Sequence, residues 1–443
     1  MSDSDQPAPQ TRSLGGTEYS WCRAIPSGTG ITVLSLLLCK PFPPHTLQTI
    51  VQKLQLTHPI LRSKLTYSTP ISFTISPDPY TQINSLTTSQ SFHQIIEHEL
   101  SLNQNWPNPV NSDDQTELFY CTHYSIEQGN KWVLVFRVHT SICDRTSGVS
   151  LLRELLSLIR GNGGEEGVDD KVNLGIEEII PSGKASKPFW ARGVDLLGYS
   201  LNSFRFSNLE FKDVESTRSS GMVRLRLDKD QTDAVLAGCK ARGIKLCGAM
   251  SAAAIIAAYS SKHLPENQWE KYAVVTLVDC RKELDPPLQS HNFGFYHSAV
   301  LNTHDISGET ELWELASRCY TGFKIATNSN KHFSDMNDLN FLMGKAIDNP
   351  GLTPSASSRT SFVAVFEDPV IDDDTSNLQQ EIGLEDFVGC SSVHGIGPSI
   401  AVFDTIRNGG LDCSCVYPTP LHSREQMQGL VDEIKGILLN GIS

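Results

Sequence analysis

A histidine and an aspartate lie five residues apart in a short polar stretch of the chain. The stretch follows residues 132–138, which read as a strand, and it precedes leucines at helical spacing from Leu151 to Ile159. The histidine is His139 and the aspartate is Asp144. An imidazole suits general-base catalysis because its unperturbed pKa lies near neutral pH. This stretch is the part of the sequence that says most about function.

Residues 138–152 read Val-His-Thr-Ser-Ile-Cys-Asp-Arg-Thr-Ser-Gly-Val-Ser-Leu-Leu. The segment resembles the HHxxxDG loop of the acyltransferase superfamily. That superfamily includes BAHD acyltransferases, alcohol acetyltransferases, phthiocerol diester-forming acyltransferases and peptide-synthetase condensation domains. The resemblance implies that Asp144 holds the loop in place. In the family the second histidine is the general base, but here that position is Thr140, and the glycine position is Arg145.

Acyl transfer from a thioester needs a base, donors for the tetrahedral oxyanion and a dry channel that aligns both substrates. General-base catalysis contributes about a hundredfold to ten-thousandfold. A threonine hydroxyl is a far weaker base and offers at most a hydrogen bond. A chain with Thr140 is therefore expected to be slow, to use another base, or not to catalyse acyl transfer.

Three other histidines are candidates for a relocated base. His139 precedes Thr140, so in extended geometry its side chain points to the opposite face. The resemblance implies that His139 packs behind the loop. His297 and His394 each lie alone on an expected strand. Each of the three has two possible roles. It is either a structural residue, in the core with its hydrogen bonds satisfied or on the surface, or the relocated general base.

The second half of the chain contains a matching set of motifs. Residues 278–281 read Val-Asp-Cys-Arg, and residues 292–296 read Asn-Phe-Gly-Phe-Tyr. Similar segments in condensation domains and alcohol acetyltransferases imply that Arg281 pairs with Asp144 across the domain interface. A buried carboxylate needs such a partner, and a guanidinium binds it with fixed geometry. The alternative is that Arg281 is a surface residue at the end of a strand.

The residues expected to bind substrate are Asn292, Ser391 and Ser392, with Arg145 as a site for an anionic group or a CoA phosphate. The alternative for Arg145 is an exposed arginine at the start of a helix. Cys143 in the same loop is either a nucleophile or a packed core residue, and the lack of an adjacent imidazole favours packing. No metal-ligand spacing is present in the sequence.

Composition excludes several classes of protein. The chain has 443 residues, 36 Lys and Arg against 50 Asp and Glu, and a net charge of −14, which argues against sequence-independent nucleic-acid binding. Eleven cysteines without a CxxC pair indicate reduced, buried thiols. The N-terminus does not resemble a signal peptide, and no apolar stretch is long enough to span a membrane. We expect a cytoplasmic monomer.

Strand and helix patterns alternate along both halves and predict two domains. Residues 1–16 are expected to be disordered, 17–185 to form an N-terminal domain, 186–220 to be a crossover linker, and 221–443 to form a C-terminal domain. Glycines and acidic residues at 161–186 predict a surface loop, and residues 371–380 a loose acidic loop. Gly409 after Asn408 predicts a hairpin, and Ser423 a helix start.

The resemblance implies an α/β fold of two chloramphenicol-acetyltransferase-like domains. Each domain is expected to have a mixed sheet flanked by helices, and a tunnel is expected between them. The implied function is a CoA-thioester-dependent acyltransferase of specialised metabolism, with acyl-CoA as co-substrate, no bound cofactor and a small-molecule acceptor. The alternative acyl donor is a carrier-protein thioester. The alternatives are a degenerate protein that binds a small molecule or a protein partner, and a chamber repurposed for cyclisation or isomerisation.

Overall fold

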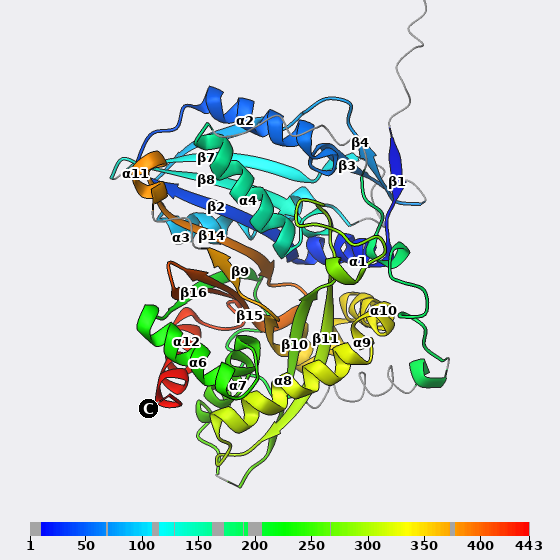
Figure 1. The fold of residues 1–443 in the computed structure, drawn as a ribbon, viewed down its shortest axis with the longest axis vertical. Helices are drawn as coiled ribbons and strands as arrows, with labels where there is room; N and C mark the ends of the chain where they lie inside the picture. Colours follow the sequence, from blue (N-terminus) through cyan, green and yellow to red (C-terminus); the bar gives the residue numbers. More distant parts are fainter. Residues whose placement is uncertain are drawn as a thin grey trace, which may run out of the picture.

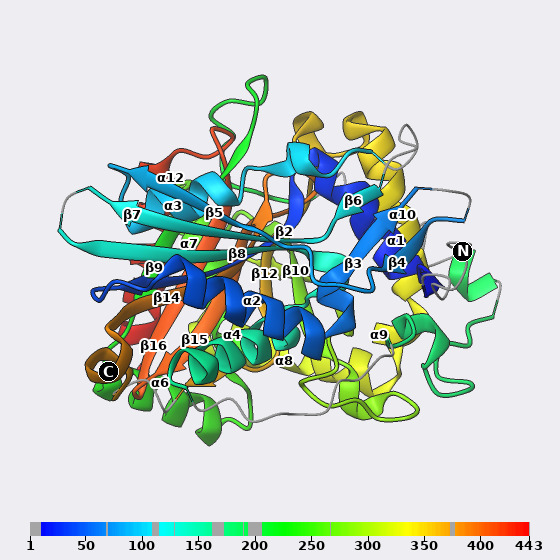
Figure 2. The ribbon, with the colours of Figure 1, turned by 90° about the horizontal axis from the view of Figure 1, so that it is seen from above.

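The computed structural model of the chain forms two halves that stack on each other (Figure 1). It describes residues 10–67, 70–108, 115–127, 129–161, 172–188, 190–193, 206–265, 267–372 and 377–442. The first half occupies the top of the view and the second half the bottom. Seen from above, the strands of the upper sheet run across those of the lower sheet (Figure 2). The expected α/β fold with mixed sheets and flanking helices is confirmed.

The upper sheet has five strands in the order β14-β2-β8-β7-β5. Its inner strand β2 is buried along almost its whole length, as the largely apolar run from Ile31 to Leu38 predicts for a strand covered on both faces. The strands are β2 (Thr29–Leu38), β5 (Ile83–Thr88), β7 (Phe119–Ile126), β8 (Lys131–His139) and β14 (Leu384–Val393).

Helices cover both faces of this sheet. One face packs against α2 and α4, and the opposite face packs against α3 and the second half of the chain. A smaller sheet of four short strands lies beside it, in the order β1-β4-β3-β6. These elements are α1 (Gly16–Ala24), α2 (Pro44–Thr57), α3 (Phe92–Glu99), α4 (Arg145–Ile159), β1 (Thr11–Ser13), β3 (Ser63–Thr66), β4 (Ser72–Ile75) and β6 (Gln115–Glu117).

The lower sheet has seven strands, six of them in the order β11-β10-β12-β15-β16-β9, with β13 paired to β15. Helices α6, α7, α8 and α12 bury their apolar residues against it, and α7 is buried on nearly all sides because it is rich in alanine. The strands are β9 (Ser219–Arg226), β10 (Glu270–Asp279), β11 (His297–Ile306), β12 (Arg359–Phe366), β13 (Val370–Asp372), β15 (Gly397–Arg407) and β16 (Gly410–Thr419).

Two predicted features near the end of the chain are present in the structure. Ser423 caps α12 by accepting a hydrogen bond from the Gln426 N–H, and the predicted hairpin joins β15 to β16. The helices of the second half are α6 (Lys229–Ala241), α7 (Leu246–Ser260), α8 (Leu312–Asn328), α9 (Lys331–Ser334), α10 (Met336–Asp348), α11 (Leu378–Ile382) and α12 (Arg424–Asn440). In the described part of the chain no single helix has the length and apolar character of a membrane span.

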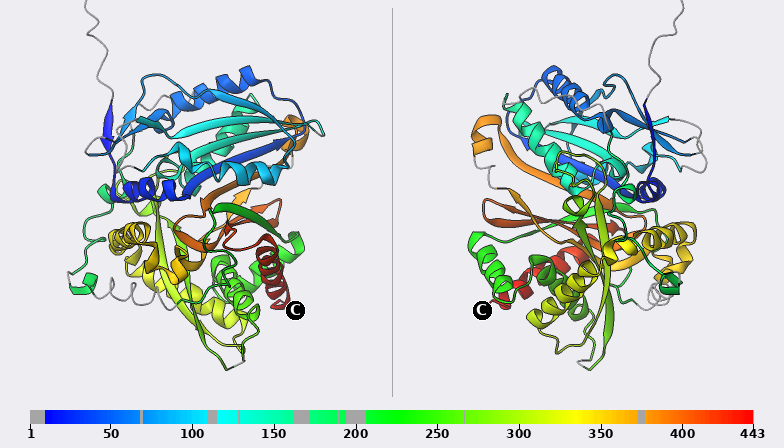
Figure 3. Two further views of the ribbon diagram at one scale, coloured as in Figure 1. Left: turned by 180° about the vertical axis from the view of Figure 1, so that it is seen from behind. Right: turned by 45° about the vertical axis from the view of Figure 1, so that its right-hand side comes forward.

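The two halves exchange a strand, which the predicted boundary at residue 221 did not foresee. Strand β14 belongs to the second half in sequence, yet it pairs antiparallel with β2 at the edge of the upper sheet. Figure 3 shows β14 reaching from the lower half to the upper one. The pairing gives β2 a neighbour on its exposed edge, since an unpaired edge would leave backbone groups without partners. The N-terminal sheet is therefore incomplete without residues 384–393.

Three predictions about loops need correction. Residues 11–13 form β1 and residues 16–24 form α1, so structure begins before the predicted limit of residue 16. In the acidic loop, β13 and α11 flank residues 373–376, which lie outside the described residues. In the loop at 161–186, Ile176 is fully buried against the second half. Residues 162–171 of that loop and most of the crossover, 194–205, also lie outside the described residues.

Candidate functional site

The loop that joins β8 to α4 forms the centre of the site. Strand β8 ends at His139, a single 3-10 turn covers residues 140–142, and Asp144 is the N-cap of α4. Asp144 Oδ1 accepts a hydrogen bond of 2.8 Å from the Ser147 N–H, so the aspartate begins the helix. Thr146 does not cap the helix, since its hydroxyl donates to Asp279 Oδ2 at 2.8 Å.

Arg281 contacts Asp144 from the opposite half of the chain. Its two terminal nitrogens donate to the two carboxylate oxygens, each at 2.9 Å, in the bidentate geometry typical of strong pairs. The Tyr296 N–H also donates to Asp144 Oδ2 at 2.8 Å. The two residues that the resemblance pairs across the interface therefore lie in direct contact, and Arg281 is not a surface residue.

Charge compensation keeps Asp144 ionised although it is buried. The side chains of Asp144 and Arg281 are 1% and 3% exposed. Burial alone would raise the pKa of the Asp144 carboxyl, but the Arg281 guanidinium and the His297 imidazole hold that pKa well below its ordinary value. The same contact raises the pKa of Arg281 despite the opposing effect of burial. The pair is a fixed, charged joint between the halves.

The Asn-Phe-Gly motif packs directly against this joint. The Asp144 N–H donates to the Gly294 carbonyl at 3.0 Å, and the ring of Phe293 stacks on His58 with 4.0 Å between ring centres. His58 begins the His-Pro-Ile-Leu-Arg stretch after α2. The His-Pro-Ile-Leu-Arg stretch of the first half thus contacts the Asn-Phe-Gly motif of the second half beside the Asp144–Arg281 pair.

A cavity of about 580 Å³ lies between the two halves beside the loop. Its walls are mostly apolar and come from both halves of the chain. The first half contributes α1, β2 and α4, and the second half contributes α10 and strands β10, β11, β12, β14 and β15. An apolar cavity with a few polar groups is the usual form of a small-molecule site. The predicted tunnel remains an expectation, because the structure establishes only the cavity.

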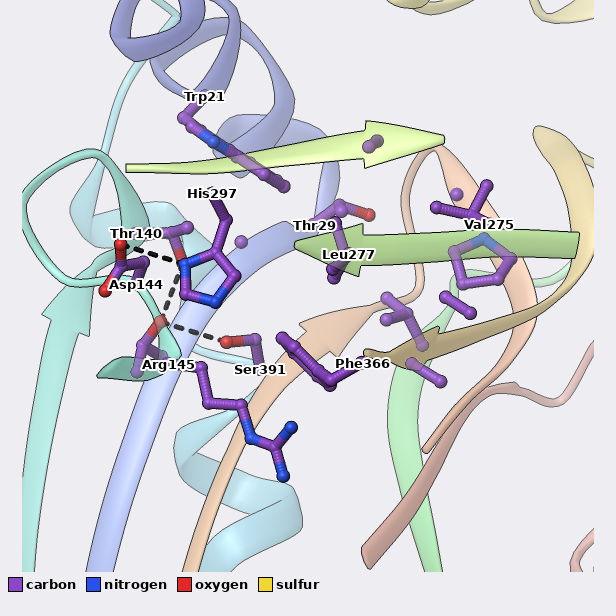
Figure 4. Close-up of a pocket in the computed structure, with 18 of the residues that line it drawn as sticks. Trp21, Thr29, Thr140, Asp144, Arg145, Val275, Leu277, His297, Phe366 and Ser391 are labelled. Carbon is purple, nitrogen blue, oxygen red and sulfur yellow. Dashed lines mark hydrogen bonds and ion pairs between the residues drawn. The ribbon is translucent and has the colours of Figure 1, made fainter. Parts of the chain in front are cut away.

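His297 lies in this cavity and contacts Asp144. It is the first residue of β11, and its Nδ1 atom is 3.0 Å from Asp144 Oδ2, an ion-pair contact rather than a well-aligned hydrogen bond. Figure 4 shows the imidazole with one nitrogen toward Asp144 and the other turned away from it. The ring is 5.9 Å from that of Phe366 and 6.4 Å from that of Phe295. Of the three candidate histidines, His297 is the one that the cavity exposes.

The other two histidines lie outside the cavity. His139 packs edge-on against Trp106 behind the loop, and its Nδ1 atom contacts the Ser141 hydroxyl at 2.6 Å. Burial lowers the pKa of His139 to about 3. His394 faces a separate, smaller pocket, where burial and two nearby arginines lower its pKa to about 4. Neither imidazole contacts the cavity that holds His297.

Three hydroxyl groups form a chain along the cavity wall. Thr140 Oγ1 is 2.7 Å from Thr32 Oγ1, which is 2.9 Å from Ser391 Oγ. The residues come from the loop, β2 and β14, so the exchanged strand completes the chain. Figure 4 labels Thr140 and Ser391, the two ends of this chain. Hydroxyls of this kind donate or accept hydrogen bonds as a ligand requires.

Sequence reasoning did not identify Thr32, although its polar side chain interrupts the apolar run of β2 and could have marked it.

The remaining predicted residues divide between the cavity and its surroundings. Ser392 lines the cavity, but its hydroxyl accepts the Ile31 N–H at 2.9 Å. Asn292 lies outside the cavity, where its side chain accepts the Gln289 N–H. The substrate-binding role of Asn292 therefore stays a prediction.

Arg145 and Cys143 also line the cavity, but both are already engaged. Arg145 is largely buried rather than an exposed helix-start residue. Its guanidinium donates to Asp404 Oδ1 at 2.8 Å and lies 4.1 Å from the centre of the Phe366 ring. Its charge is thus compensated inside the protein. Burial, followed by the nearby charge of Asp144, raises the pKa of Cys143 well above its ordinary value, which opposes a nucleophilic role.

Comparisons with known proteins give one family match over part of the chain and several solved structures with a similar fold. Residues 216–327 match the family described as phthiocerol/phthiodiolone dimycocerosyl transferase C-terminus. No curated protein matches the chain in sequence. Among solved structures, polyketide synthase associated protein 5 from Mycobacterium tuberculosis has a TM-score of 0.69 and 17% identity, with 98% of each chain covered.

Two further structures show the range of proteins that share the architecture. The trichothecene 15-O-acetyltransferase from Fusarium sporotrichioides has a TM-score of 0.69 and 11% identity, covering 97% of this chain and 95% of that one. The cyclization-docking bidomain of a peptide synthetase from Sorangium cellulosum has a TM-score of 0.68 and 14% identity, covering 99% and 87%. The chain therefore shares the fold of these acyltransferases and peptide-synthetase domains.

Proposed function

We propose that the protein is a CoA-thioester-dependent acyltransferase in which His297 has taken over the role of general base. The acceptor is a small molecule with a hydroxyl or an amine. The observation that carries the proposal is the position of His297, an imidazole in the cavity that contacts the buried Asp144 through Nδ1. A base must reach the nucleophile's proton and must be held in one orientation, and this contact supplies the orientation.

The proton transfers follow from the two ring nitrogens. With its proton on Nδ1, facing Asp144, the neutral imidazole has a free electron pair on Nε2. Nε2 takes the proton of the acceptor as the acceptor attacks the thioester carbonyl. When the tetrahedral intermediate collapses, the carbon–sulfur bond breaks and the imidazolium returns the proton to the leaving thiolate. Asp144 stays ionised and stabilises the transient imidazolium of His297.

The hydroxyl chain is our candidate for stabilising the oxyanion. Thr140, Thr32 and Ser391 line the cavity together with His297, and each hydroxyl is held by its neighbour. Fixed donors in a cavity poor in water stabilise developing charge more strongly than donors in bulk water do. In this proposal Thr140 replaces the usual base with a hydrogen-bond donor, and His297 supplies the basicity.

A second function is favoured by a different observation. The family's base position carries Thr140, which cannot abstract a proton, and this supports a protein that binds a ligand in the cavity without acyl transfer. The fold is also shared by an epimerization domain of tyrocidine synthetase B, at a TM-score of 0.60 and 12% identity, and by the cyclization domain already described. A chamber that promotes cyclisation or isomerisation is therefore the remaining alternative.

The experiment that tests the proposal combines a donor panel with a histidine variant. Purified protein is mixed with acyl-CoAs of increasing chain length and with alcohol and amine acceptors, and release of free CoA thiol is followed. The His297→Gln variant is expected to lose about a hundredfold to ten-thousandfold in kcat, the usual contribution of a general base. The matched control is His304→Gln, since His304 lies on the same strand and outside the cavity.

Two results would count against the proposal. Equal turnover of His297→Gln and the wild-type protein would remove His297 from the chemistry. A lack of turnover with every donor, together with a raised melting temperature in the presence of a small molecule, would favour the binding function instead.

A further inference from the structure

A second, smaller pocket adjoins the main cavity, and we call it the annex. It has a volume of about 290 Å³ and shares Ala346 and Ile396 with the wall of the main cavity. Its other lining residues are largely polar, and they include Arg218, His394 and Thr217. The main cavity is apolar, so a ligand that extends into the annex passes from apolar to polar surroundings.

The annex carries positive charge without a paired carboxylate. Arg218 lines it, and its guanidinium donates hydrogen bonds to the Ser357 and Val214 carbonyls. The acidic residue with an influence on Arg218 is Asp213, whose carboxylate accepts the Ser216 N–H and hydroxyl instead. Within the described part of the chain, neither Arg218 nor the nearby Arg359 forms an ion pair with a carboxylate.

Arg359 lines the main cavity, and its guanidinium donates to the carbonyl of Gly395, a residue that lines the annex. Arg359 is 1% exposed, and all its hydrogen bonds go to backbone carbonyls, among them those of Val393 at 2.9 Å and Gly395. Burial and the neighbouring charge of Arg218 lower the pKa of Arg359 to about 9. A buried cation without a counter-ion is unfavourable, and an anion nearby would offset that cost.

His394 adds a neutral donor to the same place. The Ser220 hydroxyl accepts the Val393 N–H at 3.0 Å, so its own proton is available for His394 Nδ1, which is 2.9 Å away. This arrangement leaves the ring proton of His394 on Nε2. The Arg218 guanidinium and an N–H donor therefore line one pocket, and the Arg359 guanidinium lies beside it in the wall of the main cavity, in a chain whose net charge is −14.

We propose that the annex binds the anionic group of a ligand, a phosphate or a carboxylate, whose apolar part lies in the main cavity. The observation behind it is that Arg218, which lines the annex, and Arg359, which lines the main cavity, form no ion pair with a carboxylate in the described part of the chain, where the two pockets share Ala346 and Ile396. The anion is either the phosphate of a phosphopantetheine donor or a carboxylate on the acyl group or acceptor. This inference deepens the proposed function and rests on it only in calling the ligand a substrate.

The test uses pairs of ligands that differ in the anionic group. Dissociation constants are measured by calorimetry for 4′-phosphopantetheine against pantetheine, and for octanoate against octanol. In the wild-type protein at least one anionic ligand is expected to bind tenfold more tightly than its neutral partner. The Arg218→Gln variant is expected to abolish that difference. The control Arg318→Gln removes a surface arginine of α8 and is expected to preserve it.

The ligand pair that shows the difference in affinity identifies which part of the substrate carries the anion. Preference for the phosphate indicates the donor, and preference for the carboxylate indicates the acyl group or acceptor. The inference is overturned if neither anion is preferred, or if the preference survives in Arg218→Gln. Because the readout is binding, it is independent of turnover, and a failed transfer assay would contradict the proposed function without affecting this result.

Discussion

His297 Nδ1 lies 3.0 Å from Asp144 Oδ2, and the two residues come from opposite halves of the chain. The same carboxylate already binds Arg281 with both oxygens. Asp144 therefore has two cationic or potentially cationic partners, and it connects a structural ion pair to an imidazole in the cavity. In the family to which the loop is similar, the histidine precedes the aspartate on the loop itself. Here an imidazole reaches the aspartate from the facing strand.

Moving the base back to the loop tests this relationship. In the wild-type background, Thr140→His is expected to lower turnover, because it removes a hydroxyl of the proposed oxyanion site while His297 already provides a base. In the His297→Ala background, Thr140→His is expected to restore at least about tenfold of the lost turnover. The measurement is kcat for thiol release in the four proteins. Thr140→Val serves as the control for loss of the hydroxyl, and absence of rescue would argue against a shared role for the two positions.

Local sequence patterns, together with the family resemblance, were enough to predict the Asp144–Arg281 pair. The strand, the polar loop and the helix leucines set the position of Asp144, and the segment around Arg281 supplied its partner by resemblance. Both residues lie at ends of regular elements, and such ends are visible in hydrophobic periodicity. The contact between the two side chains is present as the resemblance implies.

The choice among the histidines needed long-range information. His297 pairs with Asp279 across β10 and β11, and this register places it beside the loop. Nothing in the sequence near His297 differs from the surroundings of His394, which also follows or begins a strand. The exchange of β14 between the halves was equally hidden, because strand pairing depends on register and tertiary contacts rather than on local propensity.

Removing one charge of the buried Asp144–Arg281 pair should destabilise the fold. Asp144→Asn leaves the buried Arg281 with a neutral partner in place of its bidentate one and with the more exposed Asp279 as a remaining carboxylate contact, and a loss of about 3 kcal/mol in the free energy of unfolding is expected. Arg281→Met is expected to cost a similar amount for the converse reason. The double variant should lose clearly less than the sum, since neither charge remains. Urea denaturation measures all three.

An exposed ion pair serves as the comparison for these two single variants and the double variant. Lys229 and Asp233 lie one helical turn apart on α6, and both side chains are more than half exposed. Asp233→Asn is expected to change the free energy of unfolding by about 0.5 kcal/mol or less. Additive losses in the Asp144 and Arg281 variants would mean that the buried contact contributes no coupling.

The cysteines make a prediction about thiol reactivity. All eleven are free, and ten are buried, whereas Cys39 is exposed. Ellman's reagent is therefore expected to modify one thiol per native chain and eleven after denaturation. Cys143→Ala is expected to retain most of the turnover, because the raised pKa of this thiol opposes a nucleophilic role. Rapid labelling of Cys143 in the native protein would contradict its burial.

Buried neutral histidines should make the protein sensitive to acid. Burial lowers the pKa of His139 to about 3, and it lowers the pKa values of His304, His394 and His422 to about 4. The unfolded chain binds protons at these residues near pH 6.5. Below that pH the unfolded state therefore holds more protons, so stability that is present above about pH 6.5 is lost as the pH falls.

Each such histidine contributes a loss of about 1.4 kcal/mol per pH unit between its two pKa values. The free energy of unfolding, measured in urea at pH 7.5 and at pH 5.5, is expected to fall by several kcal/mol. His139→Asn keeps an acceptor for the Ser141 N–H and hydroxyl and removes one titrating group, so it should reduce the slope by about 1.4 kcal/mol per pH unit. His45→Asn, at an exposed position on α2, is the matched control for a histidine-to-asparagine substitution. Equal slopes for both variants would show that His139 is not held neutral by burial.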